Sequence, residues 1–222
     1  MNKTACIFGS TGLIGSHLLD LLVNDSRYER IIVFNRSLKD HTHPKIRQIL
    51  SDYESISEVS NDLVANEYYC CLGTTIKKAK TREAFEYVDY LLPLQIARIA
   101  IENKVDKYLI VSSIGASEQS RNFYLRTKGK MEQEVSRLGI KRLHIFRPSM
   151  LLGKRNEKRL AESVGQVFMK FFGFLMFGVL RKYKAIHAKT VAAAMLAVAN
   201  QNTDKKFFAS DEIENIGQSG KI

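Results

Sequence analysis

The sequence predicts an α/β fold, a doubly wound parallel sheet with a small helical region at its carboxyl-terminal end. Three observations predict this fold. Apolar strand-like runs alternate with helical patterns, several of these runs are continuous enough to be covered on both faces, and the first run leads into a glycine-rich turn. The chain has 222 residues, 45% of them hydrophobic and 26% charged, which suits one globular domain with a small appendage.

The expected elements alternate along most of the chain. Strand-like runs predict strands at 3–8, 31–34, 46–50, 68–72, 108–111 and 143–146, of which 108–111 is apolar at every position. Apolar residues at helical spacing predict a first helix after the turn that follows the first strand, and further helices over 82–102, 122–138 and 187–200. The polar segment 204–222 is expected to fray after one short element.

A glycine-rich turn with the spacing G-x-x-G-x-x-G follows the first strand. Gly9 lets the chain leave the strand sharply, Gly12 leaves room for a pyrophosphate, and Gly15 lets the next helix pack tightly on the strand. Free N–H groups at the start of that helix would face the phosphates. An ordinary glycine-rich turn has the same residues, but the order of strand, turn and helix favours an NAD(P) site. The expected cofactor contacts here are Gly9, Ser10, Thr11, Gly12, Leu13 and Ile14.

This turn predicts a Rossmann-type sheet, so we assign residues 1–150 to an NAD(P)-binding core and residues 151–222 to a small region packed on it. An apolar stretch at 166–180 dominates the small region and is too short and too interrupted to span a bilayer. Three interpretations stay open: a core helix, which we favour, the wall of a hydrophobic substrate pocket, or an element at a membrane surface. The flanking basic residues are Lys154, Arg155, Lys158, Arg159, Arg181, Lys182 and Lys184.

The cofactor is expected to be NADPH rather than NADH. The second strand ends at Asn35 and Arg36, where an NAD-specific site usually has an acidic residue for the ribose hydroxyls. Arg36 instead offers a cationic fork for a 2′-phosphate, although an arginine in a surface loop would look the same. Asp52 and Tyr53, after the third strand, are expected beside the adenine. Small residues after the fourth strand would let the backbone pass under the ribose and diphosphate: Leu72, Gly73 and Thr74.

A serine, a tyrosine and a lysine are expected to meet at the carboxyl edge of the sheet. Ser113 ends the fifth strand, and Tyr124 and Lys128 share one face of the next helix. Hydride reduction of a carbonyl needs a proton donor to the developing alkoxide. Tyr124 would supply this proton, while the Lys128 ammonium would stabilise the phenolate and bind the nicotinamide ribose. Ser113 would orient the substrate oxygen. The Tyr-x-x-x-Lys spacing also arises by chance, so its weight comes from its place after the glycine turn and the serine.

The remaining features predict no further chemistry. We interpret the net charge of +11 as a solvated basic face rather than a nucleic-acid site, because no nucleic-acid-binding motif accompanies it. Cys70 and Cys71 are expected to point to opposite faces of the fourth strand as buried thiols. The histidines lack metal-ligand spacing, so no metal site is expected. No signal peptide precedes the first strand, and we expect a cytoplasmic protein.

Five motifs occur in order along almost the whole chain. They are Gly9-Ser10-Thr11-Gly12-Leu13-Ile14-Gly15, Cys70-Cys71-Leu72-Gly73-Thr74-Thr75, Ser112-Ser113-Ile114-Gly115-Ala116, Tyr124-Leu125-Arg126-Thr127-Lys128-Gly129 and Phe146-Arg147-Pro148. Together they resemble the atypical short-chain dehydrogenase/reductases similar to Tat-interacting protein, the CC3-like oxidoreductases. The resemblance implies a Rossmann-fold NADPH binder with Ser113, Tyr124 and Lys128 in the triad positions. In this family the physiological substrate is poorly defined, and regulatory or binding roles are attributed to some members.

We therefore expect an NADPH-dependent oxidoreductase that transfers hydride between the nicotinamide and a carbonyl or alcohol carbon. Its partner would be a small-molecule substrate, and whether this substrate is hydrophobic stays an open alternative. The alternative is an NADPH-binding regulator without turnover, which the short carboxyl-terminal region favours. A sugar-nucleotide epimerase or dehydratase shares the triad but would need more room for its substrate.

Overall fold

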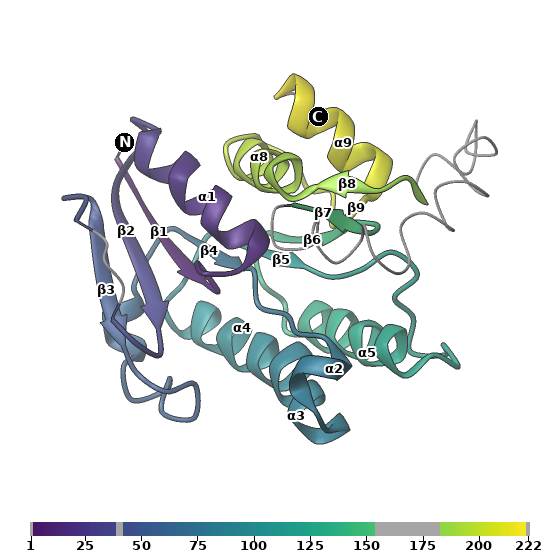
Figure 1. Cartoon of the computed structure of the whole chain (residues 1–222). Helices are drawn as coiled ribbons and strands as arrows, with labels where there is room; N and C mark the ends of the chain where they lie inside the picture. Colours follow the sequence, from purple (N-terminus) through teal and green to yellow (C-terminus); the bar gives the residue numbers. More distant parts are fainter. Residues whose placement is uncertain (1, 39–41, 154–182, 221–222) are drawn as a thin grey trace.

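The computed structural model describes residues 2–38, 42–153 and 183–220 (Figure 1). Within these residues, the main sheet has seven strands in the order β3-β2-β1-β4-β5-β6-β9, and all neighbouring strands are parallel. The strand order reverses between β1 and β4, as in a doubly wound Rossmann sheet. The fold class predicted from the sequence is therefore confirmed.

The elements follow one another as strand and helix, with two short additional helices. The strands of the main sheet are β1 (Lys3–Phe8), β2 (Tyr28–Asn35), β3 (Ile46–Leu50), β4 (Glu67–Cys70), β5 (Lys107–Val111), β6 (Leu143–Arg147) and β9 (Phe207–Ala209). The helices are α1 (Leu13–Asn24), η1 (Ser60–Leu63), α2 (Ile76–Ala79), α3 (Arg82–Glu86), η2 (Tyr87–Leu91), α4 (Leu92–Glu102), α5 (Phe123–Arg137), α8 (Ala188–Ala199) and α9 (Ser210–Ser219). A second, two-stranded sheet pairs β7 (Leu151–Leu152) with β8 (Ile186–His187).

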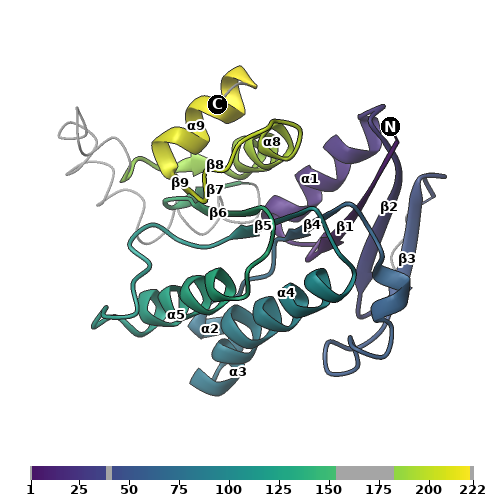
Figure 2. The ribbon, with the colours of Figure 1, turned by 180° about the vertical axis from the view of Figure 1, so that it is seen from behind.

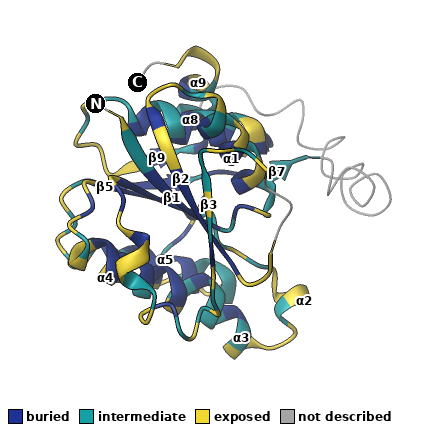
Figure 3. Ribbon diagram, turned by 90° about the vertical axis from the view of Figure 1, so that its left-hand side faces the viewer, coloured by how far each residue is buried: buried dark blue, intermediate teal, exposed yellow. Residues whose placement is uncertain are grey.

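Helices cover both faces of the main sheet, with α1, α8 and α9 on one face and α4 and α5 on the other (Figures 1 and 2). Each face has its own apolar core, because successive side chains of a strand point to opposite sides. In β4, Tyr69 packs with α1 and α8, whereas Cys70 packs with α4 and α5. Cys71 returns to the α1 side, so the two cysteines lie on opposite faces as expected. The central strands are buried between the two helical layers (Figure 3).

The carboxyl-terminal segment differs from its expectation. Instead of fraying, it adds β9 as an edge strand of the main sheet and then α9, which packs on α8. Phe208 explains why this segment joins the sheet. It is fully buried, and its ring stacks on that of Phe146 in β6 at 5.1 Å between centroids. The apolar stretch 166–180 and all its flanking basic residues except Lys184 lie outside the described residues. None of the helices that the structure describes is long and apolar enough to cross a membrane.

The helix expected over 82–102 is interrupted. It divides into α3, the π-helical turn η2 and α4. Pro93, in the first turn of α4, has no N–H and cannot donate to the carbonyl of Asp89 one turn earlier. Helical turns of the π type widen the backbone and are frequent at functional sites. Asp89 lies in this π-helical turn and is buried.

His144 in β6 is expected to make the stability of the fold depend on pH. Its ring is buried, Nδ1 lies 2.8 Å from the Lys205 carbonyl oxygen, and Nε2 has no hydrogen-bond partner. Burial lowers the pKa of His144, so the unfolded chain takes up this proton more readily. The free energy of unfolding should therefore fall as the pH falls through about 6.5, the pKa of an unperturbed histidine.

Thermal unfolding of the wild type and of His144→Gln between about pH 8 and pH 5 tests this dependence. The wild type should lose more stability than the variant over this interval, and the difference isolates His144 from the carboxylates that also titrate. Equal losses in the two proteins would contradict the prediction.

Candidate active site

The turn between β1 and α1 places glycines where a side chain would not fit. Gly9 has a φ of 86°, and a Cβ there would lie 2.9 Å from the carbonyl oxygen of Cys71. A Cβ at Gly15 would lie 2.2 Å from the carbonyl oxygen of Gly9, so its absence lets α1 pack directly onto the end of β1. Gly12 precedes α1 as its N-cap and has no side chain to cap the helix. The first N–H groups of α1 are therefore available to an anion such as a diphosphate.

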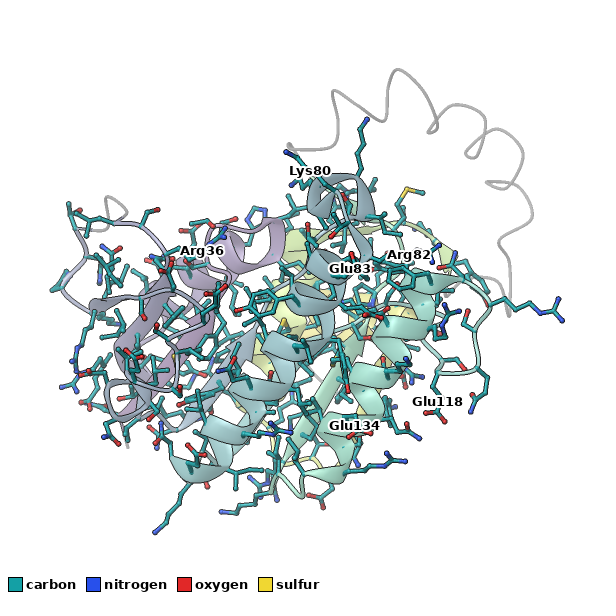
Figure 4. The ribbon with its side chains drawn as sticks, turned by 90° about the horizontal axis from the view of Figure 1, so that it is seen from below. Arg36, Lys80, Arg82, Glu83, Glu118 and Glu134 are labelled. Carbon is teal, nitrogen blue, oxygen red and sulfur yellow. The ribbon has the colours of Figure 1, made fainter. Side chains whose placement is uncertain are left out.

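The end of β2 is tied to this turn. The Ser10 hydroxyl donates to Oδ1 of Asn35 at 3.1 Å, and Nδ2 of Asn35 donates to Oε1 of Gln48 at 3.2 Å. Ser10 and Asn35 are buried, so these bonds fix the turn rather than reach into solvent. Arg36 follows directly and is exposed at the end of β2 (Figure 4). Of this group, Arg36 has the side chain that is accessible to a ligand.

Tyr53 lies beside Arg36, after β3. Its ring packs on Phe34 with 4.9 Å between centroids. Burial raises the pKa of Tyr53, and the nearby charge of Arg36 partly opposes this rise. Asp52 is exposed. The structure therefore brings together an aromatic ring and a guanidinium where the sequence predicted an adenine and a 2′-phosphate.

A cavity of about 290 Å³ at the carboxyl ends of β5 and β6 contains two of the three predicted catalytic residues. Ser113 and Tyr124 are both half-buried there, accessible to a ligand. The Ser113 hydroxyl makes a long hydrogen bond of 3.4 Å to the Ile114 carbonyl oxygen. The Tyr124 ring is held by Phe85, 5.5 Å away between centroids. The residues that line the cavity are Ser112, Ser113, Ile114, Tyr124, Pro148, Ser149, Met150 and Leu151.

Local packing fixes the helix that carries Tyr124 and Lys128. Asn122 caps the start of α5, and its side chain accepts a hydrogen bond from the Leu125 N–H at 3.2 Å. A Cβ at Gly129 would lie 2.2 Å from the carbonyl carbon of Ser117, so the glycine lets α5 press against the preceding loop. The first two turns of α5 are thereby held against the loop that follows β5.

Lys128 lies deeper than the cavity. Its Nζ is 2.8 Å from Oδ1 of Asp89, a charge pair without a well-directed hydrogen bond. Oδ2 of Asp89 accepts a hydrogen bond of 2.8 Å from the Thr74 N–H. Burial lowers the pKa of Lys128, but the charges of Asp89 and Tyr124 outweigh burial, and the pKa is raised. The lysine is therefore a permanent cation beneath the segment that follows β4.

Asp89 is the site residue that sequence reasoning missed. Asp89 is one of four acidic residues in the helix expected over 82–102, and the motif spacing does not include it, so nothing in the sequence distinguishes it. The segment after β4 lies directly over it, because a Cβ at Gly73 would lie 3.5 Å from Oδ1 of Asp89 and 4.0 Å from Nζ of Lys128. Leu72 and Thr74, on either side of Gly73, are half-buried. Among the described residues, no group of three or more His, Cys, Asp or Glu side chains forms a possible metal site.

Comparison with known proteins gives a family and a set of folds. The HIM1 family model matches residues 29–174. Protein FMP52, mitochondrial, of Debaryomyces hansenii is 31% identical, over 88% of this chain and 86% of the relative. Protein HTATIP2 of Rattus norvegicus is also 31% identical, over 88% of this chain and 80% of the relative.

Solved structures resemble the fold at low identity. The Bordetella bronchiseptica enzyme WbmH in complex with NAD⁺ has a TM-score of 0.70 at 16% identity, covering 98% of this chain and 80% of that one. The UDP-Glc/GlcNAc 4-epimerase of Campylobacter jejuni has a TM-score of 0.67 at 13% identity, covering 96% and 82%. Such identities support the fold alone.

These comparisons correct one expectation and establish the family. The cytoplasmic location predicted from the sequence is contradicted, because the FMP52 relatives of Debaryomyces hansenii, Candida albicans and Emericella nidulans are all named as mitochondrial. The family model covers well over half of the chain, and two relatives match most of its length. The chain belongs to the HIM1 family and, with HTATIP2, to the atypical short-chain dehydrogenase/reductases related to Tat-interacting protein.

Proposed function

We propose that the protein is an NADPH-dependent oxidoreductase acting on a carbonyl or alcohol carbon of a small molecule. The observation that carries this proposal is the cavity where Ser113 and Tyr124 meet, beside the buried Lys128. The uncapped start of α1 and the exposed Arg36 suit a dinucleotide phosphate. The solved complexes of MoeE5 and WbmH, which share the fold, contain NAD and support a nicotinamide dinucleotide here.

Each of the three residues has a distinct task in this proposal. When bound, the nicotinamide supplies or accepts the hydride. Tyr124 gives its proton to the developing alkoxide in reduction and takes it back in oxidation. Ser113 donates a hydrogen bond that orients the substrate oxygen. Lys128 offers its remaining ammonium hydrogens to the ribose hydroxyls and keeps positive charge near the phenol.

Calorimetric titration of the wild type with NADPH and NADH, followed by a panel of aldehydes and ketones, tests this function. We expect tighter binding of NADPH and oxidation of NADPH by at least one carbonyl compound. Binding of NADPH without turnover across the panel would favour an NADPH-binding regulator. No binding of either nucleotide would overturn the proposal.

Arg36 is expected to determine the preference for NADPH. Because a charge-assisted hydrogen bond contributes roughly 1.5–3 kcal/mol, Arg36→Ala should weaken NADPH binding about tenfold or more. Binding of NADH, which lacks the 2′-phosphate, should change little. Arg30→Ala, an exposed arginine toward the other end of β2, is the control and should alter neither affinity. Equal losses of NADPH and NADH affinity would show that Arg36 does not read the phosphate.

A further inference from the structure

An arginine lies over an aromatic ring beside the proposed active site. The guanidinium carbon of Arg82, the first residue of α3, is 5.1 Å from the ring centroid of Phe123, the first residue of α5. Phe85 packs on Phe123 and on Tyr124, with 5.7 and 5.5 Å between ring centroids. One aromatic cluster therefore connects Arg82 to the tyrosine that lines the cavity.

Arg82 has no counter-charge of its own. It is exposed, and its side chain makes no hydrogen bond or ion pair with another described residue. Other surface arginines are paired, as Arg27 is with Asp25. Hydrogen bonds from its own N–H and from Thr81 lower the pKa of Glu83 more than the charge of Arg82 does, so Glu83 serves the start of α3. The five N–H donors of Arg82 are therefore available to an external anion.

The surroundings of Arg82 are basic. Arg126 lies 5.9 Å from the same Phe123 ring, but it already donates to the Ser120 carbonyl oxygen at 2.9 Å. Figure 4 shows Arg82 apart from Arg36, so an anion at Arg82 would be distinct from the 2′-phosphate expected at Arg36. Three exposed lysines on α2 and in the turn after it also form no ion pair with a described residue: Lys77, Lys78 and Lys80.

The cavity itself has no charged group to receive an anion. The described residues that line it are serines, a tyrosine and apolar residues. Its volume of about 290 Å³ is at the lower limit for ligand pockets. A substrate with more than a small ring or a short chain around its reacting carbon would therefore extend out of the cavity, where the cationic side chains lie.

We propose that Arg82 binds a carboxylate or phosphate group of the substrate, at the end of the molecule remote from the reacting carbon. This inference rests on the proposed function and deepens it, because it defines the substrate as an anionic carbonyl compound or alcohol. A guanidinium suits this task, because its planar fork can donate two parallel hydrogen bonds to one oxyanion. The contact with Phe123 restricts the fork, which reduces the entropy lost on binding.

Straight-chain aldehydes that carry a carboxylate at the far end, compared with their methyl esters, test this inference. The chain length is varied, so that the carboxylate reaches Arg82 in some members of the series. At those lengths the wild type with NADPH should have a higher kcat/KM for the acid than for the ester. Arg82→Ala should lower the kcat/KM for the acid about tenfold or more, chiefly through KM, because the contact exists in both the ground and transition states. The kcat/KM for the esters should stay within about twofold of the wild type.

Lys78→Ala is the matched control. Lys78 is an exposed cation of the neighbouring α2 and makes no ring contact with a described residue, so its removal tests the general attraction of a basic surface. The kcat/KM for the acids should change no more than about twofold. Equal losses in Lys78→Ala and Arg82→Ala would overturn the assignment of a direct contact to Arg82.

The affinity for NADPH distinguishes the substrate from the cofactor as the source of the anion. Arg82→Ala should bind NADPH within about twofold of the wild type in a calorimetric titration. A loss of NADPH affinity as large as the loss of kcat/KM for the acids would assign Arg82 to the cofactor and overturn its role with the substrate.

Binding of the corresponding hydroxy acids and hydroxy esters, titrated without nucleotide, separates this inference from the proposed function. These compounds are the products of the reduction and bind without turnover. The wild type should bind the hydroxy acids more tightly than the hydroxy esters, and Arg82→Ala should bind both equally. This result, with no turnover of any aldehyde, would reject the proposed reaction and keep the anion site. Equal affinity of the wild type for acid and ester at every chain length would overturn the inference.

Discussion

Replacing Tyr124 with phenylalanine should lower the rate of NADPH-dependent carbonyl reduction by a factor of about 10² to 10⁴, the usual contribution of a positioned acid. In the proposed mechanism the hydroxyl supplies the proton, whereas the ring packs against Phe85 at 5.5 Å between centroids. Phenylalanine keeps that ring contact. Binding of NADPH, measured by calorimetry, should therefore stay within about twofold of the wild type while steady-state turnover is lost.

Tyr87→Phe is the matched control for this experiment. Tyr87 lies in η2, and its hydroxyl is buried without a hydrogen-bond partner. Removal of this hydroxyl breaks no bond, so both turnover and NADPH binding should resemble those of the wild type. Retained turnover in Tyr124→Phe would remove Tyr124 from the mechanism, and equal losses in both variants would point to a general disturbance of this region.

The parallel core of the fold was predictable because each central strand carries its own signal. The run Tyr108-Leu109-Ile110-Val111 is apolar at every position, as a strand covered on both faces must be. The edge strand β9 has no such signal. It is three residues long, and its place in the sheet depends on Phe208 stacking against Phe146, a contact that exists only after the chain has folded.

The same distinction applies to the site. Motif spacing placed the glycine turn at the end of β1 and brought Ser113 and Tyr124 to one cavity, because carboxyl ends of parallel strands share an edge. The partner of Lys128 was not predictable in this way. Asp89 reaches the lysine through the π-helical turn before Pro93, and periodicity in the sequence treats that region as one regular helix.

Replacing Glu67 with leucine should cause the largest loss of stability, about 3–5 kcal/mol in the free energy of unfolding measured with urea. Glu67 is the first residue of β4, a central strand, and lies at the amino ends of the strands, opposite the proposed site. It is 2% exposed. One carboxylate oxygen accepts hydrogen bonds from Tyr28 at 2.6 Å and Tyr69 at 2.8 Å, and the other pairs with Lys3 at 2.7 Å.

The size of this effect follows from what remains after the carboxylate is removed. Asn200, at the end of α8, still donates to the Tyr28 hydroxyl at 2.9 Å, and the Tyr28 and Tyr69 hydroxyls lie 3.0 Å apart, so one can donate to the other. The second of these buried hydroxyls is then left without the carboxylate as its acceptor, and Lys3 loses its counter-charge. Each buried donor left unsatisfied costs about 1–3 kcal/mol. The network also connects β1, β2 and β4 to the end of α8, so its loss weakens the attachment of the carboxyl-terminal helices to the sheet.

Asp62→Leu separates this effect from the general removal of an acidic residue. Asp62 pairs with Arg47, but both side chains are 49% exposed, and water compensates such a pair. Its loss should change the free energy of unfolding by no more than about 0.5 kcal/mol. A Glu67→Leu loss as small as this would mean that water or a shifted side chain satisfies the tyrosines. The attachment of the carboxyl-terminal helices to the sheet would then depend chiefly on apolar packing, that of α8 against α1.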